Sequence, residues 1–347
     1  MTPHTLAGLG WSADFLRQLD LDEIGHCPPA RVAAVHRTRV DLIGETGVLS
    51  LSLPPGLPAG EVAVGDWLLL TPERDAIRRL LDRRSRLSRK AAGTGIARQA
   101  IAANVDTLAI VTSCNAEFSE GRLDRYLALA RAGGVAPLIV LTKADLADPS
   151  PFRGRAEAAG RGVPVLVLDA RDPLQVAEVA AFCGPGRTLA LAGSSGVGKS
   201  TLAATLTGQA LATQAIREDD AKGRHTTTAR HLIATLGGGW LIDTPGMREL
   251  QLADAEDGIA ATFDDIEGLA DDCRFSDCRH DGEPGCAVAA AIAAGALDPG
   301  RLARWRKLKR EDRVNTETLA QARARGRAFG KMARRAIQAK RDRQDGW

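Results

Sequence analysis

The chain has 347 residues, of which 44% are hydrophobic, and its formal net charge is +3. This length and apolar content predict a soluble globular protein of two or three compact units. No apolar run is long enough to span a membrane, and the N-terminus lacks the pattern of a secretory signal, so we expect a cytoplasmic protein with no membrane partner. Six cysteines are too few for a disulfide framework in a chain of this length.

The N-terminal part is rich in short β-branched runs. From Arg31 to Leu81 these runs (RVAAV, GVLSLSL and EVAVGDWLLL) are separated by Gly and Pro clusters. The pattern is typical of a small antiparallel barrel, and we expect residues 1–85 to form an N-terminal segment and an OB-like β-barrel. A fragment of a β-sandwich has the same periodicity and stays an alternative.

Residues 86–105 are rich in Arg and Lys and contain few apolar positions before Ile101. We interpret them as a basic linker, either a solubilising connection or a segment that contacts phosphate. From Asp106 the pattern changes to apolar strands that alternate with amphipathic helices. Strands that are apolar throughout indicate a mostly parallel sheet covered on both faces, so residues 106–250 are predicted to be an α/β domain.

A phosphate-binding loop follows the strand TLALAG and precedes a predicted helix. The segment matches the pattern G-x-x-x-x-G-K-[ST], in which glycines let backbone N–H groups surround phosphate oxygens at a helix N-terminus. Lys199 is expected to reach the β- and γ-phosphates, Ser200 to bind Mg²⁺ and Thr201 to donate to the α-phosphate. The predicted phosphate-binding residues are Gly193, Ser194, Ser195, Gly196, Val197, Gly198, Lys199, Ser200 and Thr201.

Two further motifs fit the same site. Asp243-Thr244-Pro245-Gly246 follows the strand WLI, where Asp243 is expected to hold Mg²⁺ through water and the N–H of Gly246 to approach the γ-phosphate. Between the loop and this motif, the sequence GRHTTT contains three threonines, one of which would complete the Mg²⁺ shell in the presence of the γ-phosphate. We choose the middle one, Thr227, although the spacing does not distinguish it from its neighbours and a plain strand start has the same composition.

The nucleotide base is predicted from Thr142-Lys143-Ala144-Asp145, which resembles the Asn-Lys-x-Asp motif that reads guanine. The Asp145 carboxylate would accept from the ring N1–H and the exocyclic amine, a donor pair that adenine does not present. Lys143 would lie along the base. Thr142 replaces the usual Asn, which calls into question the Asn contacts with the base and with the phosphate loop. Asp169-Ala170 takes the place of the Ser-Ala motif whose backbone N–H supports guanine O6, with Asp169 as a second departure.

The order of these motifs is unusual. The guanine-reading elements at Thr142 and Asp169 precede the phosphate loop at Gly193 and the motif at Asp243, whereas ordinary GTPases have the reverse order. A compact sheet with neighbouring termini tolerates such a rearrangement. We therefore predict a circularly permuted P-loop GTPase domain at residues 106–250, whose γ-phosphate-responsive segment leads directly into the C-terminal unit.

The C-terminal part, residues 251–347, is predicted to be an α-helical zinc-binding domain with a basic tail. Its cluster C-x4-C-x-H-x5-C provides three thiolates and one imidazole, which make a closed, structural zinc site, from Cys273, Cys278, His280 and Cys286. From Arg301 onward the chain has sixteen Lys or Arg and five acidic residues. This surplus favours contact with RNA, although a basic tail is also common as a solvated surface.

With the barrel, the permuted motifs and the Cys/His cluster in this order, the multidomain α/β chain resembles the ribosome small subunit-dependent GTPase A family over essentially its full length. The resemblance is carried by RKAAG (89–93), AANVD (102–106), TKAD, GSSGVGKST, GRHTTT, DTPG and the four metal ligands. It implies a late maturation factor or checkpoint of the small ribosomal subunit. The barrel would lie on rRNA, and the subunit would stimulate GTP hydrolysis and thereby release. We expect a monomer that binds GTP or GDP with Mg²⁺ and one Zn²⁺.

One residue bears on the hydrolysis step. Met247 follows DTPG, where many GTPases carry a Gln that positions water, so intrinsic hydrolysis should be slow. His225 is our candidate for the catalytic substitute once a partner orders its loop; a plain loop histidine is the alternative. Two other functions stay open: a nucleotide-switched RNA-binding scaffold with incidental hydrolysis, and a GTPase that delivers a metal or small molecule.

Overall fold

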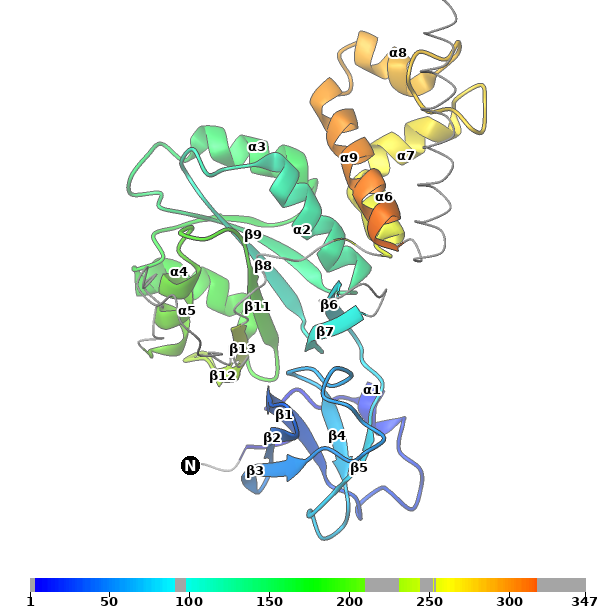
Figure 1. Ribbon diagram of the computed structural model, residues 1–347. Helices are drawn as coiled ribbons and strands as arrows, with labels where there is room; N and C mark the ends of the chain where they lie inside the picture. The colour runs from blue at the N-terminus through cyan, green and yellow to red at the C-terminus, as the bar shows by residue number, and fades with distance from the viewer. Residues whose placement is uncertain (1–3, 91–97, 210–230, 244–251, 253, 317–347) are drawn as a thin grey trace, which may run out of the picture.

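The computed structural model describes residues 4–90, 98–209, 231–243, 252 and 254–316 (Figure 1). In this part of the chain the longest hydrogen-bonded path of strands runs β10-β9-β8-β11-β13-β12-β1-β2-β3. It joins an α/β sheet to an antiparallel N-terminal unit, and a group of helices packs beside the α/β sheet. None of the described helices is both long enough and apolar enough to cross a membrane.

The N-terminal unit begins with a short helix and continues with five antiparallel strands. These elements are α1 (Ala13–Leu16), β1 (Pro29–Val35), β2 (Arg39–Gly44), β3 (Gly47–Ser52), β4 (Trp67–Leu70) and β5 (Ile77–Leu80). The strands pair in the order β3-β2-β1-β4-β5, and their buried apolar side chains form a core of their own. Within the described residues no pairing joins β3 to β5, so the unit is a partly open arrangement. Five antiparallel strands agree with the expectation, whereas the OB assignment itself stays a prediction.

Strand β1 connects this unit to the α/β sheet. Its first half pairs with β4, and Ala34 in its second half pairs with His231 of β12 (His231–Ala234), after an irregularity in the register between Val32 and Ala34. The buried Arg31 side chain strengthens the joint: it donates to the Leu9 carbonyl at 2.6 Å and to the Thr188 hydroxyl at 2.7 Å. Burial lowers the pKa of Arg31 to about 10.

Residues 86–105, which we interpreted as a basic linker, contain two strands among the residues that the structure describes. Strands β6 (Arg86–Lys90) and β7 (Arg98–Ala103) pair antiparallel in a separate two-stranded sheet. Leu87 and Ile101 are buried, so apolar side chains of this segment pack into the fold although it also carries Arg and Lys. The paired strands lie between the N-terminal unit and the α/β sheet along the chain, and residues 91–97 are outside the described part.

The α/β sheet has the order β10-β9-β8-β11-β13-β12. Its strands are β8 (Thr107–Ser113), β9 (Ala136–Thr142), β10 (Val165–Val167), β11 (Thr188–Ala192), β12 and β13 (Trp240–Asp243). All neighbouring pairs are parallel except β12 with β13. Every residue of β8 and of β11 is buried, which confirms the prediction from their unbroken apolar runs.

Helices cover both faces of this sheet. They are α2 (Glu120–Ala132), α3 (Ser150–Gly160), α4 (Pro173–Ala180) with a 3-10 turn (Ala181–Cys183), and α5 (Lys199–Thr207). Alternate residues of β8 belong to different cores: Leu108 and Ile110 pack with α2 and α3, whereas Ala109 and Val111 pack with α4 and α5. This two-faced burial is what keeps the carboxyl ends of the strands, where the predicted motifs lie, in one row.

The C-terminal helices form a unit that packs against α2 through α6 and α9 (Figure 1). They are α6 (Glu256–Thr262), α7 (Asp264–Asp271), α8 (Ala287–Ala293) and α9 (Pro299–Thr316). Gly258 of α6 lies so close to α2 that a Cβ atom there would be 2.1 Å from the carbonyl oxygen of Ala128. An ion pair adds to this contact, since the Arg304 guanidinium lies 2.7 Å from the buried carboxylate of Asp124. The helical C-terminal unit that we expected is thus docked on the α/β domain.

Candidate functional site

The predicted phosphate loop connects β11 to α5. Three of its glycines have positive φ angles, namely 140° at Gly193, 74° at Gly196 and 94° at Gly198. At Gly193 a Cβ atom would also be 2.1 Å from the carbonyl oxygen of Val111 in β8. Only glycine combines this backbone conformation with so close an approach, which is the local reason for the glycine pattern.

Lys199 is the first residue of α5, and its side chain turns back across the loop. Its ammonium group donates to the carbonyl oxygen of Gly193 at 2.8 Å and to that of Ser194. Ser200 and Thr201 follow in the first turn of the helix and are exposed. The loop therefore has its cation inside and two hydroxyl side chains at a helix N-terminus, where the helix dipole favours an anion.

The predicted motifs meet at the carboxyl ends of the parallel strands. Parallel pairing sets Ala190 of β11 opposite Ile242 of β13, so the strand end at Asp243 lies beside the start of the phosphate loop. On the other side of β11, Ser113 of β8 pairs with Thr142 of β9, which brings the guanine motif to the same end of the sheet. The structure describes the backbone of Asp243, whereas His225, Thr227 and Gly246 lie outside the described residues.

Thr142 makes the contact with the phosphate loop that its replacement of Asn had called into question. Its side chain is fully buried, and its Oγ1 lies 2.6 Å from the carbonyl oxygen of Val197 and 3.1 Å from that of Thr112. The hydroxyl has one proton to donate, and the shorter distance favours Val197. A hydroxyl thus joins the end of β9 to the phosphate loop in this chain.

The two predicted base-reading segments follow β9 and β10. Lys143 adopts a positive φ of 58°, and the turn that follows carries Ala144 and the carboxylate of Asp145. Ala170 is buried, and its carbonyl oxygen accepts from Thr205 Oγ1 of α5 at 2.8 Å. This hydrogen bond fixes the second segment to the helix that begins at the phosphate loop.

Sequence reasoning missed Arg171, which links the two segments. Its guanidinium lies 2.7 Å from Asp145 Oδ2 and 2.9 Å from Asp169 Oδ2. Because Arg171 donates to the Asp169 carboxylate from both its side chain and its backbone, the pKa of Asp169 is below its usual range. A basic residue directly after Asp169-Ala170 was the available signal, but its partner across the loop was not visible in the sequence.

The four predicted metal ligands come together before α8. The atoms that they offer as ligands all lie within 4.8 Å of one another. Zn–S bonds of about 2.3 Å and Zn–N bonds of about 2.0 Å in a tetrahedron require S–S distances of about 3.8 Å and S–N distances of about 3.5 Å. The Sγ atoms of Cys273 and Cys286 are 3.9 Å apart, and they lie 3.6 and 3.5 Å from His280 Nδ1. The donor set can therefore hold a tetrahedral ion.

Neighbouring groups orient this cluster. Cys286 caps α8, since its Sγ accepts from the backbone N–H of Ala289 at 3.3 Å. Arg306 of α9 donates to the His280 carbonyl at 2.6 Å, and the ring of Trp305 lies 5.6 Å from the imidazole. These contacts attach the metal-ligand loop to α9, the same helix whose Arg304 contacts α2. The cluster is thus part of the framework that docks the C-terminal unit.

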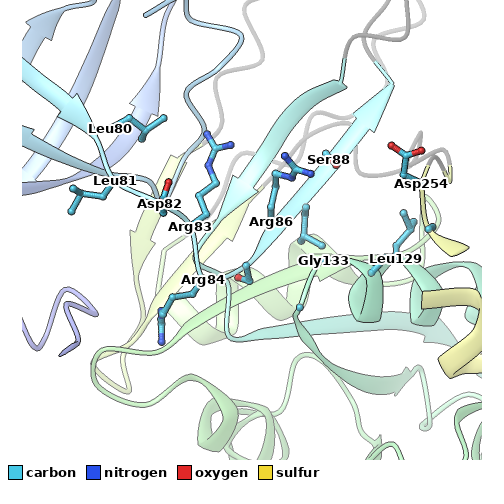
Figure 2. A pocket seen from close by; sticks show the side chains of 15 residues that line it. Leu80, Leu81, Asp82, Arg83, Arg84, Arg86, Ser88, Leu129, Gly133 and Asp254 are labelled. Carbon is cyan, nitrogen blue, oxygen red and sulfur yellow. The ribbon is translucent and has the colours of Figure 1, made fainter. Parts of the chain in front are cut away.

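A cavity of about 690 Å³ lies away from both sites, where β5, β6, the end of α2 and the residues before α6 meet (Figure 2). In Figure 2, Arg83 and Arg86 extend to one side and Arg84 points to the other. Arg83 is paired with Asp66 at 2.6 Å, whereas the Arg86 side chain is exposed. The cavity therefore exposes positive charge at the joint between the N-terminal unit and the α/β sheet.

Comparisons with known proteins agree with this architecture. The sequence model of the RsgA GTPase family matches residues 80–253, about half of the chain. A Mesorhizobium japonicum protein named small ribosomal subunit biogenesis GTPase RsgA is 53% identical over 90% of this chain and 91% of its own length. A Vibrio parahaemolyticus protein named small ribosomal subunit biogenesis GTPase RsgA 2 is 46% identical over 100% of this chain and 96% of its own length.

Solved structures are similar as well. YjeQ from Thermotoga maritima superposes with a TM-score of 0.60 at 26% identity, covering 81% of this chain and 97% of that one. YloQ, described as a circularly permuted GTPase, has a TM-score of 0.60 at 24% identity and covers 84% of this chain and 97% of its own, a likeness of fold alone. With the guanine motif ahead of the phosphate loop along the chain and beside it in the sheet, the chain belongs to the RsgA GTPase family and is a circularly permuted GTPase.

Proposed function

We propose that this chain hydrolyses GTP at the carboxyl ends of the parallel strands and acts in the late maturation of the small ribosomal subunit. The observation that carries the proposal is the hydrogen bond from Thr142 to Val197, which joins the guanine motif to the phosphate loop in a permuted chain. The names of the RsgA relatives supply the biological role, small ribosomal subunit biogenesis.

The phosphate loop would bind the nucleotide through its own backbone. Its N–H groups and the N-terminus of α5 face the phosphates, and Lys199 exchanges the carbonyl oxygens of Gly193 and Ser194 for the β- and γ-phosphate oxygens. Thr201 donates to the α-phosphate. Mg²⁺, when bound with the nucleotide, would neutralise phosphate charge. Ser200 would hold the ion directly and Asp243 through water.

The base would be read at the ends of β9 and β10. Asp145 accepts from guanine N1–H and the exocyclic amine, Lys143 lies along the ring, and the backbone at Asp169-Ala170 supports O6. Gly246 and Thr227 would respond to the γ-phosphate, and the segment after Asp243 leads into the C-terminal helices. A change of nucleotide state would in this way be transmitted to the C-terminal unit, which contains the Cys3His cluster.

His225 is the proposed catalytic residue, acting on the attacking water when the ribosomal subunit orders its loop. Met247 stands where a Gln would otherwise orient this water. The variant His225→Ala should keep nucleotide affinity and lose most of the turnover that the subunit stimulates. Full stimulated turnover in this variant would remove His225 from the mechanism.

Contact with rRNA is proposed for the OB-like unit, the basic residues around the cavity and the basic C-terminal stretch. Arg86 is exposed at the cavity, and α9 carries several Lys and Arg residues. We place the protein in the cytoplasm as a monomer. One structural Zn²⁺ is proposed at the Cys3His cluster, whose four protein donors complete a tetrahedral shell with no position for a catalytic water.

The deciding experiment measures GTP hydrolysis by the purified protein alone, with small ribosomal subunits and with large subunits as the control. Strong stimulation by the small subunit alone is expected. Tight binding to the subunit in the GTP state with no change in turnover would instead identify a nucleotide-switched RNA-binding scaffold. Arg86→Glu should weaken binding to the subunit, with Arg153→Glu, which changes another exposed arginine on α3, as the control.

A further inference from the structure

Arg171 connects the two base-reading segments through an unequal set of hydrogen bonds. Its backbone N–H and its Nε both lie 3.0 Å from Asp169 Oδ1, and its Nη2 lies 2.9 Å from Asp169 Oδ2. Toward Asp145 it makes one hydrogen bond, from Nη2 to Oδ2 at 2.7 Å. Arg171 is therefore anchored on Asp169 in its own loop and reaches Asp145 in the neighbouring loop with one arm.

This arm contacts the carboxylate to which the proposed function assigns the reading of guanine, and the inference rests on that assignment. A guanidinium is a planar cation that presents parallel N–H donors to a carboxylate. The N1–H and exocyclic amine of guanine are likewise two parallel N–H donors in one plane. Both groups thus suit the same acceptor, and Oδ2 of Asp145 is engaged by Arg171 in this structure.

We propose that Arg171 is a built-in competitor of the guanine base: it occupies Asp145 when the site is empty and withdraws onto Asp169 when a guanine nucleotide binds. Asp169 holds the arginine in both states, which gives a reason for a carboxylate where the related motif has serine. The competition weakens the binding of GTP and GDP alike, because both carry the same base.

The expected change in nucleotide affinity follows from the solvent exposure of the ion pair between Arg171 and Asp145. The Arg171 side chain is 66% exposed and that of Asp145 is 30% exposed, so the ion pair is in contact with solvent and is screened by salt. Loss of Arg171 should tighten guanine nucleotide binding by about two- to fivefold, the range that exposed ion pairs supply. The difference should disappear at high ionic strength, whereas a purely structural role of Arg171 would not depend on salt in this way.

The test is a titration of the full-length protein with fluorescent N-methylanthraniloyl-GDP at low and at high salt. Arg171→Ala and Arg171→Met should both bind more tightly than the wild type at low salt and equally at high salt. Arg171→Lys keeps the charge without the planar fork, so its affinity for the probe at low salt should lie between that of the wild type and that of the Ala and Met variants. Arg153→Ala is the control, because it removes an exposed arginine paired with Glu157 elsewhere in the same domain.

Equal or weaker binding by Arg171→Ala and Arg171→Met at low salt would overturn the proposal, since a competitor cannot support the ligand that it excludes. A failure of the underlying assignment has a different signature. If Asp145→Asn binds the same probe as tightly as the wild type, Asp145 does not read guanine, and the role proposed for this carboxylate is wrong whatever Arg171 does.

Discussion

Thr142 and Val197 lie 55 positions apart in the sequence, and their hydrogen bond of 2.6 Å joins the guanine motif to the phosphate loop. Both residues are buried, so the Val197 carbonyl has little access to water. The two halves of the nucleotide site are thereby held in a fixed relation before any ligand binds. Such preorganisation favours affinity because less ordering is needed on binding.

The variant Thr142→Val keeps the side-chain volume and removes the hydroxyl. It leaves a buried carbonyl oxygen without its donor, which should cost about 1–3 kcal/mol. We expect a lower unfolding temperature and GDP affinity reduced by up to about tenfold, measured by thermal unfolding and by titration with a fluorescent nucleotide. Thr142→Ser retains the hydroxyl and is the control. Wild-type affinity in Thr142→Val would show that the hydrogen bond does not support the site.

Loss of one metal ligand should unfold the C-terminal unit locally. Cys278→Ser removes a thiolate from the cluster of three cysteines and His280, and the remaining donors hold zinc much more weakly. The purified wild type should contain about one zinc per chain and the variant far less, as measured by elemental analysis. Because the C-terminal unit of the variant is already unfolded, its thermal unfolding curve should lack the transition of that unit. GDP binding should persist. Cys183→Ser, far from the cluster in the core of the α/β domain, is the control for a lost thiol.

The ion pair between α2 and α9 should contribute strongly to docking of the C-terminal unit. Arg304 Nε lies 2.7 Å from Asp124 Oδ2 and its Nη1 lies 3.0 Å from Glu120 Oε2. The Asp124 side chain is fully buried, and burial raises its pKa. Arg304→Met leaves this carboxylate without its closest cation, so we expect destabilisation by roughly 3 kcal/mol in urea unfolding.

A matched exposed pair provides the comparison for Arg304. Arg153 and Glu157 form an ion pair on the surface of α3 with both side chains more than half exposed. Arg153→Met should therefore cost less than about 1 kcal/mol. If the two arginine variants unfold at the same urea concentration, the buried pair does not hold the C-terminal unit in place.

The pH dependence of stability should reveal Glu23. Hydrogen bonds from Arg79 lower the pKa of Glu23 to about 2, and Arg78 also donates to this carboxylate. A carboxylate with a lowered pKa stabilises the fold above its ordinary value of 4.5, and this contribution is lost as the pH falls toward 2. The unfolding temperature of the wild type should thus be higher than that of Glu23→Gln at pH 6. The difference between the two temperatures should narrow steadily below pH about 4.5. A gap that is independent of pH would contradict this account, with Glu157→Gln as the exposed control.

The sequence predicted those parts of the site that depend on local chemistry. The glycines of the phosphate loop were recognisable because their positive φ angles exclude other residues, and the metal ligands because thirteen positions separate the first from the last. Unbroken apolar runs indicated the buried parallel strands β8 and β11. The roles of His225 and Thr227 and the domain boundaries stay predictions.

The order of the motifs, and hence the permutation, was thus determined by the sequence alone. The tertiary structure decided the contacts between distant segments: Thr142 with Val197, Arg171 with Asp145, and Arg304 with Asp124, which are separated by 55, 26 and 180 positions. It also decided that Arg86–Lys90 and Arg98–Ala103 pair as antiparallel strands. Local patterns report backbone preference and burial, whereas the meeting of two distant side chains depends on how whole strands and helices pack, and no short stretch of sequence contains that information.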